Sequence, residues 1–530
     1  MVGQVRRTTA GAVAAVACCA VLGGAVPARA AVSAPAASWG SPTAVGGLSS
    51  GSATALDCAA PGDCALAATV GGEAYVAREA GGSWGTAAEI PALAAADAGR
   101  SDSINALWCG SPGNCEAVGY YTAGRNQVPF TLRQAGGTWG GPQRVAGVST
   151  GAVTFLSCPR PGDCTAGGAG FVVTESNGTW GSAHQIRGVS IESVACGAPG
   201  DCAAGGQDGS QGFVVTENDG RWGAVATEPG LAFVSQVACP AAGGCVAVGE
   251  SSSAATYTLN QSSGGWGKPA IVPGLVKLAA GNGYPQPGLT APQPAVTCGA
   301  VGRCSVFGDY WSPQGDTEQA IFVSDSASGR WGQAYQLPGT GTSEDGGYGG
   351  VLVASCWAAG YCSAGGEFGY KDLAGPFVTD QAAGAWTGAS VPFENGSYSG
   401  AIGLLSCAPG FCAAVVPTDG GVLVAQATEP VPQPTSTGQA LSASSVTYGH
   451  ENTVQVRVGV AAQSGVPGGV VTVNAGNTAV CRITLKSGRG SCTLAARQLK
   501  PGAYHLVAVY GGAAAYLRSV SAHARLSVLG

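Results

Sequence analysis

Eighteen cysteines, arranged as nine close pairs after residue 31, constrain the fold of this chain more than any other feature. Seven pairs share the spacing CxxxxxC around turn residues, as in CAAPGDC and CPRPGDC, which predicts a disulfide across a tight hairpin of an exported protein. A zinc site would favour shorter spacings and histidine ligands, whereas residues 31–431 hold one histidine, His184. We therefore expect no metal and no other cofactor. The expected disulfides are Cys58–Cys64, Cys109–Cys115, Cys158–Cys164, Cys196–Cys202, Cys239–Cys245, Cys298–Cys304, Cys356–Cys362, Cys407–Cys412 and Cys481–Cys492.

A tryptophan recurs in phase with these pairs, at Trp39, Trp84, Trp139, Trp180, Trp222, Trp266, Trp331 and Trp386. One repeat, VTFLSC-PRPGD-CTAGGAG-FVVTES-NG-TWGSAHQI, predicts four short antiparallel strands joined by tight turns. Four strands per repeat are typical of β-propeller blades. Because Trp39 precedes the first cysteine pair and no tryptophan follows the eighth, the N-terminal strand should complete the last blade. The sequence thus predicts an all-β fold with an eight-bladed β-propeller, or seven blades if one repeat is degenerate.

The turn glycine and the tryptophan after it, as in Gly178 and Trp180, resemble the repeats of Asp-box and photosystem-assembly-factor-like propellers. The pattern departs from the Asp box, because its glycine stands two rather than three residues before the tryptophan and its aspartate is mostly absent. Sialidases of that fold carry an arginine triad and a tyrosine nucleophile, whereas the ten arginines of residues 31–431 are scattered along the sequence. The resemblance implies an architecture and no activity.

The two ends of the chain predict an export signal and a second domain. Residues 1–30 combine a basic start, an apolar run and a small-residue exit, which is typical of a secretory signal peptide. The propeller is expected over residues 31–431. After a proline-rich linker, residues 432–530 predict an immunoglobulin-like β-sandwich of seven short strands. With its cysteine pair, this segment resembles the bacterial Ig-like domains of exported actinobacterial-type proteins, which implies a spacer or adhesion module.

Charge is sparse and unevenly divided between the two expected domains. Charged residues make up 10% of the chain and glycine 89 of 530 residues, which favours short strands and tight turns over long helices. Residues 31–431 hold 13 Lys and Arg against 29 Asp and Glu, whereas residues 432–530 hold eight against Glu451 alone. The low charge content suits a polar extracellular surface more than a nucleic-acid binder, and no stretch after the signal is apolar enough for a membrane span. The basic domain could adhere to anionic cell-wall polymer, although drift between separately acquired modules explains the same asymmetry.

Long insertions point to a ligand site at one end of the propeller. By strand parity, the connections between second and third strands, and those between blades, lie opposite the disulfide turns, and the long ones concentrate in blades six to eight. Their aromatic and acidic side chains could bind a sugar or peptide, or only pack on one another. The candidate ligand-binding residues are Asp309, Tyr310, Trp311, Asp316, Tyr348, Phe368, Tyr370 and Asp372.

Catalytic residues are not evident in this sequence. Serine-type hydrolysis needs a positioned base, and His184 follows an outer strand where we expect it to face solvent. We predict a secreted, noncatalytic, monomeric binding or adhesion protein, with cell-wall polymer or an extracellular glycan as candidate partners. A glycan-active hydrolase or lyase of the sialidase-like propeller type is the alternative, because paired carboxylates are available. A purely structural wall protein is the third possibility.

Overall fold

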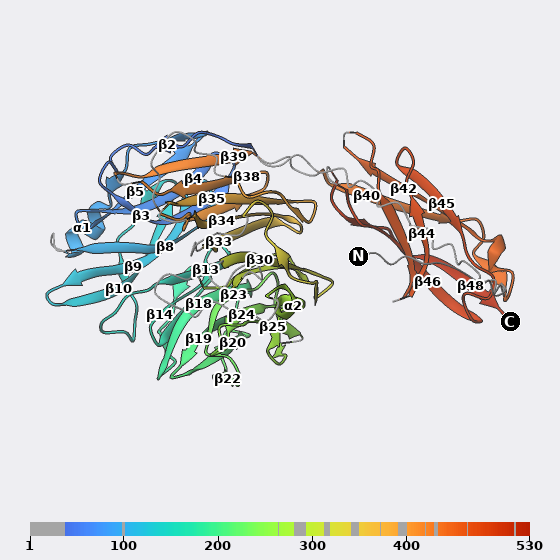
Figure 1. Ribbon diagram of the computed structural model, residues 1–530, viewed down its shortest axis with the longest axis horizontal. Helices are drawn as coiled ribbons and strands as arrows, with labels where there is room; N and C mark the ends of the chain where they lie inside the picture. Colours follow the sequence, from blue (N-terminus) through green and yellow to red (C-terminus); the bar gives the residue numbers. More distant parts are fainter. Residues whose placement is uncertain are drawn as a thin grey trace, which may run out of the picture. The chain divides into compact units, whose positions relative to one another are not determined.

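The computed structural model shows a chain built almost entirely of β-strands (Figure 1). Its described residues are 38–97, 101–262, 264–279, 293–311, 319–340, 349–370, 373–390, 400–418, 420–428, 433–463, 465–476, 478–513 and 516–530. The helices among them are α1 (Pro91–Asp97), α2 (Leu275–Leu278) and the 3-10 turn η1 (Glu451–Thr453). None of the described helices has the length and apolar character needed to cross a membrane. The predicted signal peptide lies outside the described residues.

Described residues between 38 and 428 form eight antiparallel sheets, which we number 1 to 8 by the order of their first long strands. Sheet 1 contains β3 (Ser52–Ala60), β4 (Asp63–Val70), β5 (Glu73–Ala80), β6 (Ser83–Trp84) and β7 (Ala88–Glu89), and sheet 2 contains β8 (Asp102–Ser111), β9 (Asn114–Ala123), β10 (Asn126–Ala135), β11 (Thr138–Trp139) and β12 (Gln143–Arg144). Sheet 3 contains β13 (Phe155–Arg160), β14 (Asp163–Gly168), β15 (Phe171–Ser176), β16 (Thr179–Trp180) and β17 (His184–Gln185), and sheet 4 contains β18 (Val189–Ala198), β19 (Asp201–Asp208), β20 (Gln211–Asn218), β21 (Arg221–Trp222) and β22 (Ala226–Glu228). Sheet 5 contains β23 (Phe233–Ala238), β24 (Val246–Glu250), β25 (Thr256–Ser262), β26 (Gly265–Trp266) and β27 (Ala270–Ile271), and sheet 6 contains β28 (Ala295–Ala300), β29 (Arg303–Trp311), β30 (Gln319–Ala327), β31 (Arg330–Trp331) and β32 (Tyr335–Gln336). Sheet 7 contains β33 (Gly349–Ala358), β34 (Tyr361–Tyr370), β35 (Leu373–Ala382) and β36 (Ala385–Trp386). Sheet 8 contains β37 (Leu405–Ala408), β38 (Phe411–Val416) and β39 (Leu423–Thr428) together with the N-terminal strands β1 (Ser38–Trp39) and β2 (Thr43–Ala44).

Each sheet has the three long strands that the repeat predicts, but the predicted fourth strand is divided in two in sheets 1 to 6 and in sheet 8. Both short pieces, such as β16 and β17, pair with the third strand. The glycine after the tryptophan lies between them, and in sheet 3 the Gly181 amide donates to the Thr174 carbonyl at 3.0 Å. The single outer strand of the prediction is therefore two short segments around a glycine.

The eight sheets form a closed ring. Each first strand contacts the first strand of the next sheet, from β3 through to β37, and β37 contacts β3 again. Sheet 8 joins the two ends of this region, since Trp39 on β1 pairs with Ala427 on β39, as the lone N-terminal tryptophan predicted. A separate hydrophobic cluster fills each gap between neighbouring sheets, including the gap between sheets 8 and 1. This arrangement of sheets around a ring is that of a β-propeller.

The end of the ring that carries the disulfides, which we call the disulfide end, is built from two hairpin turns in each of sheets 1 to 7 and one in sheet 8. The structure contains the eight propeller disulfides of the sequence analysis, with Cα–Cα distances of 3.9 to 4.1 Å. In sheet 4 the Gly220 amide of the second turn donates to the Gly200 carbonyl of the disulfide turn at 2.9 Å. Gly200 has a φ of +73°, and a Cβ there would lie 2.7 Å from the Gly220 nitrogen. The two turns can touch because Gly200 lacks a side chain.

A buried polar belt joins neighbouring sheets near this end. The residue that pairs with the tryptophan is a buried Glu or Gln in six sheets, namely Glu79, Gln134, Glu175, Glu217, Gln261 and Gln381. Several of these side chains bond to the preceding sheet, as when Thr174 donates to Glu217 at 2.9 Å and Gln381 donates to Asp325 at 2.9 Å. Three of the repeated tryptophans also donate to the preceding sheet, since the indoles of Trp39, Trp266 and Trp386 donate to Asp380, Thr216 and Asp325. The repeated tryptophan therefore marks a contact between sheets as well as a strand.

Strands β40 to β48 form two further sheets. One contains β40 (Thr435–Leu441), β42 (Gln455–Ala462) and β45 (Arg489–Thr493), and the other β41 (Ser445–Thr447), β43 (Val470–Ala475), β44 (Thr478–Thr484), β46 (Gly502–Tyr510), β47 (Ser519–Val520) and β48 (Ala524–Leu529). One hydrophobic cluster draws on both sheets, and the disulfide Cys481–Cys492 links β44 to β45. The described residues thus form nine strands where the sequence predicted seven, because two of them, β41 and β47, are only three and two residues long.

Candidate functional site

The end of the propeller opposite the disulfides, which we call the loop end, carries the predicted ligand residues. Asp309, Tyr310 and Trp311 end β29 in sheet 6, and Phe368 and Tyr370 end β34 in sheet 7. Sheets 6 and 7 are neighbours, because β28 contacts β33. The structure therefore brings these two groups to the same end of adjacent sheets. The remaining candidates, Asp316, Tyr348 and Asp372, lie outside the described residues, as does the side chain of Tyr370.

The described candidate residues differ in the solvent exposure of their side chains. Tyr310 is 3% exposed and belongs to the hydrophobic cluster between sheets 5 and 6, so we assign it to packing and not to ligand contact. Asp309 is also buried, and its carboxylate accepts a hydrogen bond from Gln319. Trp311 and Phe368 are half-buried, and Phe368 packs on the cluster between sheets 6 and 7. Trp311 is consequently the described aromatic side chain best placed to meet a ligand.

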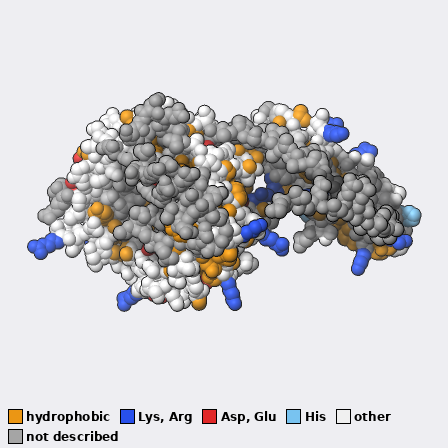
Figure 2. Space-filling model, in the orientation of Figure 1, with side chains coloured by type: hydrophobic (Ala, Val, Ile, Leu, Met, Phe, Trp, Pro, Cys, Tyr) orange, Lys and Arg blue, Asp and Glu red, His pale blue; other side chains and the backbone are white. Residues whose placement is uncertain are grey.

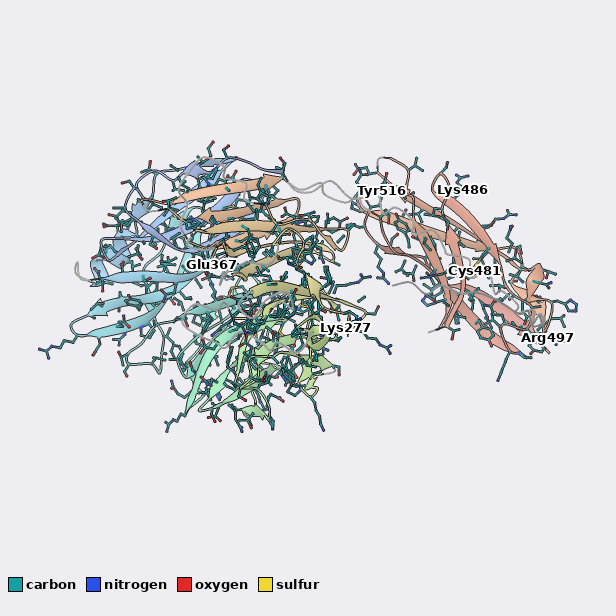
Figure 3. The ribbon with its side chains drawn as sticks, viewed as in Figure 1. Lys277, Glu367, Cys481, Lys486, Arg497 and Tyr516 are labelled. Carbon is teal, nitrogen blue, oxygen red and sulfur yellow. A yellow bond between two sulfur atoms is a disulfide. The ribbon has the colours of Figure 1, made fainter. Side chains whose placement is uncertain are left out.

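Two acidic residues occupy the position of Asp309 in the neighbouring sheets, and the cysteine and loop patterns did not identify them. Glu250, Asp309 and Glu367 each stand five residues after the second cysteine of their repeat, in three consecutive sheets. Aligning the repeats on the cysteines would have found this position. Figure 3 places Glu367 among the propeller sheets, where it is half-buried.

Burial raises the pKa of all three carboxyls, because desolvation penalises the charged form. It raises the pKa of Glu250 to about 8, with a smaller contribution from the negative charge of Asp309. Burial likewise raises the pKa of Asp309 to about 7, against the opposing bond from Gln319, and raises that of Glu367. All four ion pairs among the described residues lie at the disulfide end. None of these four ion pairs involves Glu250, Asp309 or Glu367, and a ligand with hydrogen-bonding groups would suit such carboxyls.

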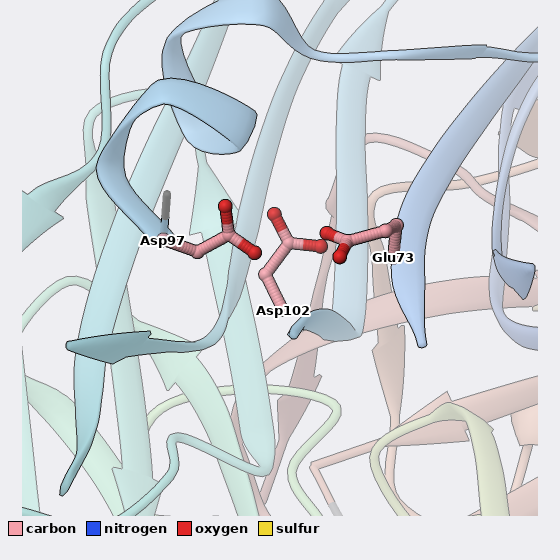
Figure 4. A group of neighbouring side chains, drawn as sticks. All are labelled: Glu73, Asp97 and Asp102. Carbon is pink, nitrogen blue, oxygen red and sulfur yellow. The ribbon is translucent and has the colours of Figure 1, made fainter. Parts of the chain in front are cut away.

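A second acidic group at the loop end lies between sheets 1 and 2. Glu73 follows the turn between β4 and β5, Asp97 ends α1, and Asp102 begins β8. The three carboxylates point toward one another (Figure 4), and one oxygen of each lies within 4.8 Å of the others. Asp97 and Asp102 are buried, and Asp102 accepts the Ala74 amide at 2.5 Å. Such oxygens could share a proton or serve as ligands of a hard divalent cation. The spacing of the cysteines does not predict this group of carboxylates.

This carboxylate group should make stability depend on pH. Burial, with Asp97 and other carboxylates nearby, raises the pKa of Glu73 to about 7, and burial raises the pKa of Asp102 to about 6. Because these folded-state pKa values exceed the ordinary ones, the folded protein binds protons more tightly than the unfolded chain, and its stability falls as pH rises from about 4 to about 7. Asp102→Asn keeps an acceptor for Ala74 and removes one charge. We expect its melting temperature to drop less than that of the wild type between pH 5 and pH 8.

The measurement is a thermal melt at both pH values in the presence of a chelator. Gln143→Glu, an exposed outer-strand change in sheet 2, serves as the control that alters charge without touching the group. Equal pH dependence of Asp102→Asn and the wild type would show that the group does not titrate as described.

The Ig-like sheets have the opposite electrostatic character. All eight of their cationic side chains are exposed, namely Arg457, Arg482, Lys486, Arg489, Arg497, Lys500, Arg518 and Arg525. Figure 3 shows Lys486 and Arg497 extending from the sheets, and in Figure 2 Lys and Arg project from the visible face while little Asp or Glu is seen. The one acid, Glu451, is fully buried. Burial alone would raise its pKa, but backbone amides including those of Arg497 and Gly449 bond to the carboxylate and hold the pKa below its ordinary value.

The fold and these sites define an all-β protein with propeller sheets followed by an Ig-like domain. Residues 439–529 match the family described as "Bacterial Ig-like domain (group 3)", which confirms the predicted Ig-like domain. No curated protein matches the chain. The abundant disulfides point to an extracellular protein, because such bonds persist in oxidising compartments.

Similar solved structures have low identity to the chain. The WD40 β-propeller domain of Doa1 is 10% identical over 73% of this chain and 96% of that one, with a TM-score of 0.41. The GH74 xyloglucanase from Xanthomonas campestris is 13% identical over 93% and 74%, with a TM-score of 0.39. PorZ, a surface component of the type-IX secretion system of Porphyromonas gingivalis, is 11% identical over 88% and 64%, with a TM-score of 0.39. At these values the likeness says nothing about activity or ligand.

Proposed function

We propose that the chain is a secreted binding protein whose Ig-like domain adheres to an anionic cell-wall polymer and whose propeller binds a glycan or peptide. In this proposal residues 1–30 are the export signal, residues 31–431 form an eight-bladed propeller with Asp-box-like repeats, and residues 432–530 form the adhering domain. The ring of eight sheets supports the blade number. A single chain acts without an obligatory partner copy.

The surface charge of the Ig-like domain carries this proposal. Eight cations face solvent while the single carboxylate is buried and bonded to backbone amides, so the accessible surface of the domain has one sign of charge. Such a surface attracts polyanions over roughly a Debye length, about 8 Å at physiological ionic strength, and loses that attraction as salt is added. Surface charge of one sign is not needed to fold a sandwich, which favours a role in adhesion.

The propeller ligand is proposed for the loop end. Trp311 offers a half-buried aromatic surface, and the half-buried carboxyl of Glu367 offers a hydrogen-bond group at the same end of the neighbouring sheet, whereas Asp309 and Glu250 lie beneath the surface. The further candidates from the sequence are Tyr348, Tyr370, Phe368, Asp316 and Asp372. Aromatic stacking together with carboxyl groups suits sugars and peptides alike.

A glycan-active hydrolase is the second candidate, on one observation. Raised pKa values of about 8 for Glu250 and about 7 for Asp309 lie in the range of a general acid at neutral pH. Both side chains are 4% exposed, however, which leaves little surface for a scissile bond. Their burial argues against hydrolysis by this pair of carboxyls.

The adhesion proposal predicts salt-sensitive retention on cell walls. Wall sacculi that carry anionic polymer should retain the full chain at low salt and release it at high salt, and sacculi stripped of the polymer should retain little. Neutralising two cations, Lys486→Gln with Arg489→Gln, should weaken retention several-fold. Lys277→Gln, an exposed change in the propeller, is the matched control and should have no effect.

Wall adhesion by charge would be contradicted if retention is unchanged both at high salt and in the Lys486→Gln, Arg489→Gln variant.

The ligand of the propeller is tested on a glycan and peptide array. A binding signal that Trp311→Ala abolishes supports the loop-end ligand, and an array pattern that Trp311→Ala leaves unchanged contradicts it.

A further inference from the structure

We propose a second binding site at the disulfide end, in a cavity between sheets 2 and 3 that takes a neutral sugar unit. The cavity has a volume of about 360 Å³, and its polar and aromatic lining comprises Trp108, Asn114, Glu116, Arg133, Gln134 and Asn177. This volume falls in the range of small-molecule sites, about 300–1,000 Å³. The site lies opposite the loop end and stands independently of the function proposed above.

The repeat by itself does not create such a cavity. Between sheets 1 and 2 the equivalent positions are Asp63 for Asn114, Ala65 for Glu116, and Arg78 for Arg133. There the gap has a volume of only about 10 Å³. The gap between sheets 1 and 2 thus lacks the opening that lies between sheets 2 and 3.

Two side chains of sheet 2 depart from their repeat positions, and both line the cavity. The residue before the first cysteine is Trp108 in sheet 2, whereas the other sheets have Asp57, Ser157, Ala195, Ala238, Thr297, Ser355 and Ser406. The residue after the second cysteine is Glu116, whereas the other sheets have Ala65, Thr165, Ala203, Val246, Ser305, Ser363 and Ala413. A large aromatic ring and a carboxylate thus replace small residues at the same cavity.

The backbone accommodates the indole of Trp108 at one position in particular. A Cβ on Gly110 would lie 2.6 Å from indole Cη2 and 2.7 Å from Cγ of Pro161 in sheet 3. Glycine at 110 therefore lets the ring lie against the chain, where Trp108 stays half-buried. A half-exposed ring beside a cavity can stack on the C–H face of a sugar.

The polar lining suits hydroxyl groups. Arg133 is paired with Glu116 and with Glu175 of sheet 3, which fixes the guanidinium and offsets one of the two negative charges. Oε2 of Glu116 and Oε1 of Gln134 are buried and have no hydrogen-bond partner among the described residues. Buried acceptors without donors are costly, and a hydroxyl donor that reaches them after a small side-chain rotation would satisfy them.

The charges that line the cavity disfavour both anionic and cationic ligands. An anion would meet two carboxylates, and a cation would meet Arg133, so a neutral polyhydroxyl group fits this pairing best. Asn114 and Asn177 are exposed at the rim and can both donate and accept. Stacking, acceptors and amides together are the chemistry of sugar recognition.

The test is calorimetric titration of the full chain with three neutral tetrasaccharides: cellotetraose, maltotetraose and tetra-N-acetylchitotetraose. We expect at least one to bind, with an affinity that Trp108→Ala lowers about tenfold or more. Glu116→Gln, which keeps the side-chain shape, should also weaken binding. Trp357→Ala removes a half-buried tryptophan near the disulfide turn of sheet 7 and should leave binding unchanged.

The proposal is overturned if no tetrasaccharide binds at millimolar concentration, or if binding survives both Trp108→Ala and Glu116→Gln unchanged. Circular dichroism and thermal melts establish that each variant is folded. If Trp108→Ala does not fold, Trp108→Leu and Glu116→Gln decide the question. Loss of wall adhesion has no bearing on these titrations, because the adhesion variants lie in the Ig-like domain.

Discussion

Reducing the disulfides should lower the melting temperature of the propeller by roughly 20 °C. Each of the eight hairpin disulfides closes a short loop, with cysteines five or six positions apart. In the chain-entropy description a loop of this length contributes about 2 kcal/mol. Eight such contributions are comparable to the roughly 5–15 kcal/mol net stability of a typical domain. The bonds also hold the turns whose glycines touch at the disulfide end, so their loss loosens every sheet.

The measurement is a calorimetric melt with and without a phosphine reductant, with alkylation and mass spectrometry to count free thiols. A single-pair variant, Cys196→Ser with Cys202→Ser, should cost about 2 kcal/mol and provides the scale for one sheet. If all propeller thiols are free and the melting temperature has not moved, the disulfides do not stabilise the fold as described.

Gly206→Ala should destabilise the propeller by about 3 kcal/mol or more, which is large for adding one methyl group. A Cβ at Gly206 would lie 1.9 Å from the carbonyl oxygen of Ser190 on the neighbouring strand. That strand bulges between Ile191 and Ser193, which pushes its backbone against β19. Because the obstacle is backbone, no side-chain rotation can relieve it, and the strands must separate.

The same position is glycine in six repeats, at Gly119, Gly168, Gly206, Gly249, Gly308 and Gly366. Gly403→Ala is the matched control, since nothing lies within 4 Å of a Cβ there and its φ is ordinary, so we expect a change near zero. Denaturant unfolding of both variants gives the comparison. A Gly206→Ala protein as stable as Gly403→Ala would show that the bulge adapts freely.

Much of the propeller could be predicted because its signals are local. A cysteine pair five or six positions apart and a glycine-tryptophan turn both act within one hairpin, so the spacing alone predicts the contact. The closing strand was predictable for a related reason, since one tryptophan stood outside the phase of the pairs. The division of the fourth strand was not, because the glycine that interrupts it looks like any other turn glycine.

The candidate sites were predicted only in part. The insertions placed Asp309, Tyr310 and Trp311 at the loop end, and their ligand role stays a prediction. Alternation along β29 turns Tyr310 into the gap toward sheet 5, where it packs. Glu250, Glu367 and the group of Glu73, Asp97 and Asp102 were missed. Their partners come from separate strands or sheets, and no spacing along the chain shows that they meet.

The sequence by itself determined the repeat, the disulfide pairs, the all-β class and the charge division between the two domains, because each depends on neighbours in the chain or on composition. Only the tertiary structure decided which carboxyls are buried, and that the gap between sheets 2 and 3 stays open while the gap between sheets 1 and 2 closes. Burial and cavity volume depend on how side chains of different sheets fill a shared space. That filling is settled by packing around the ring, which no single repeat contains.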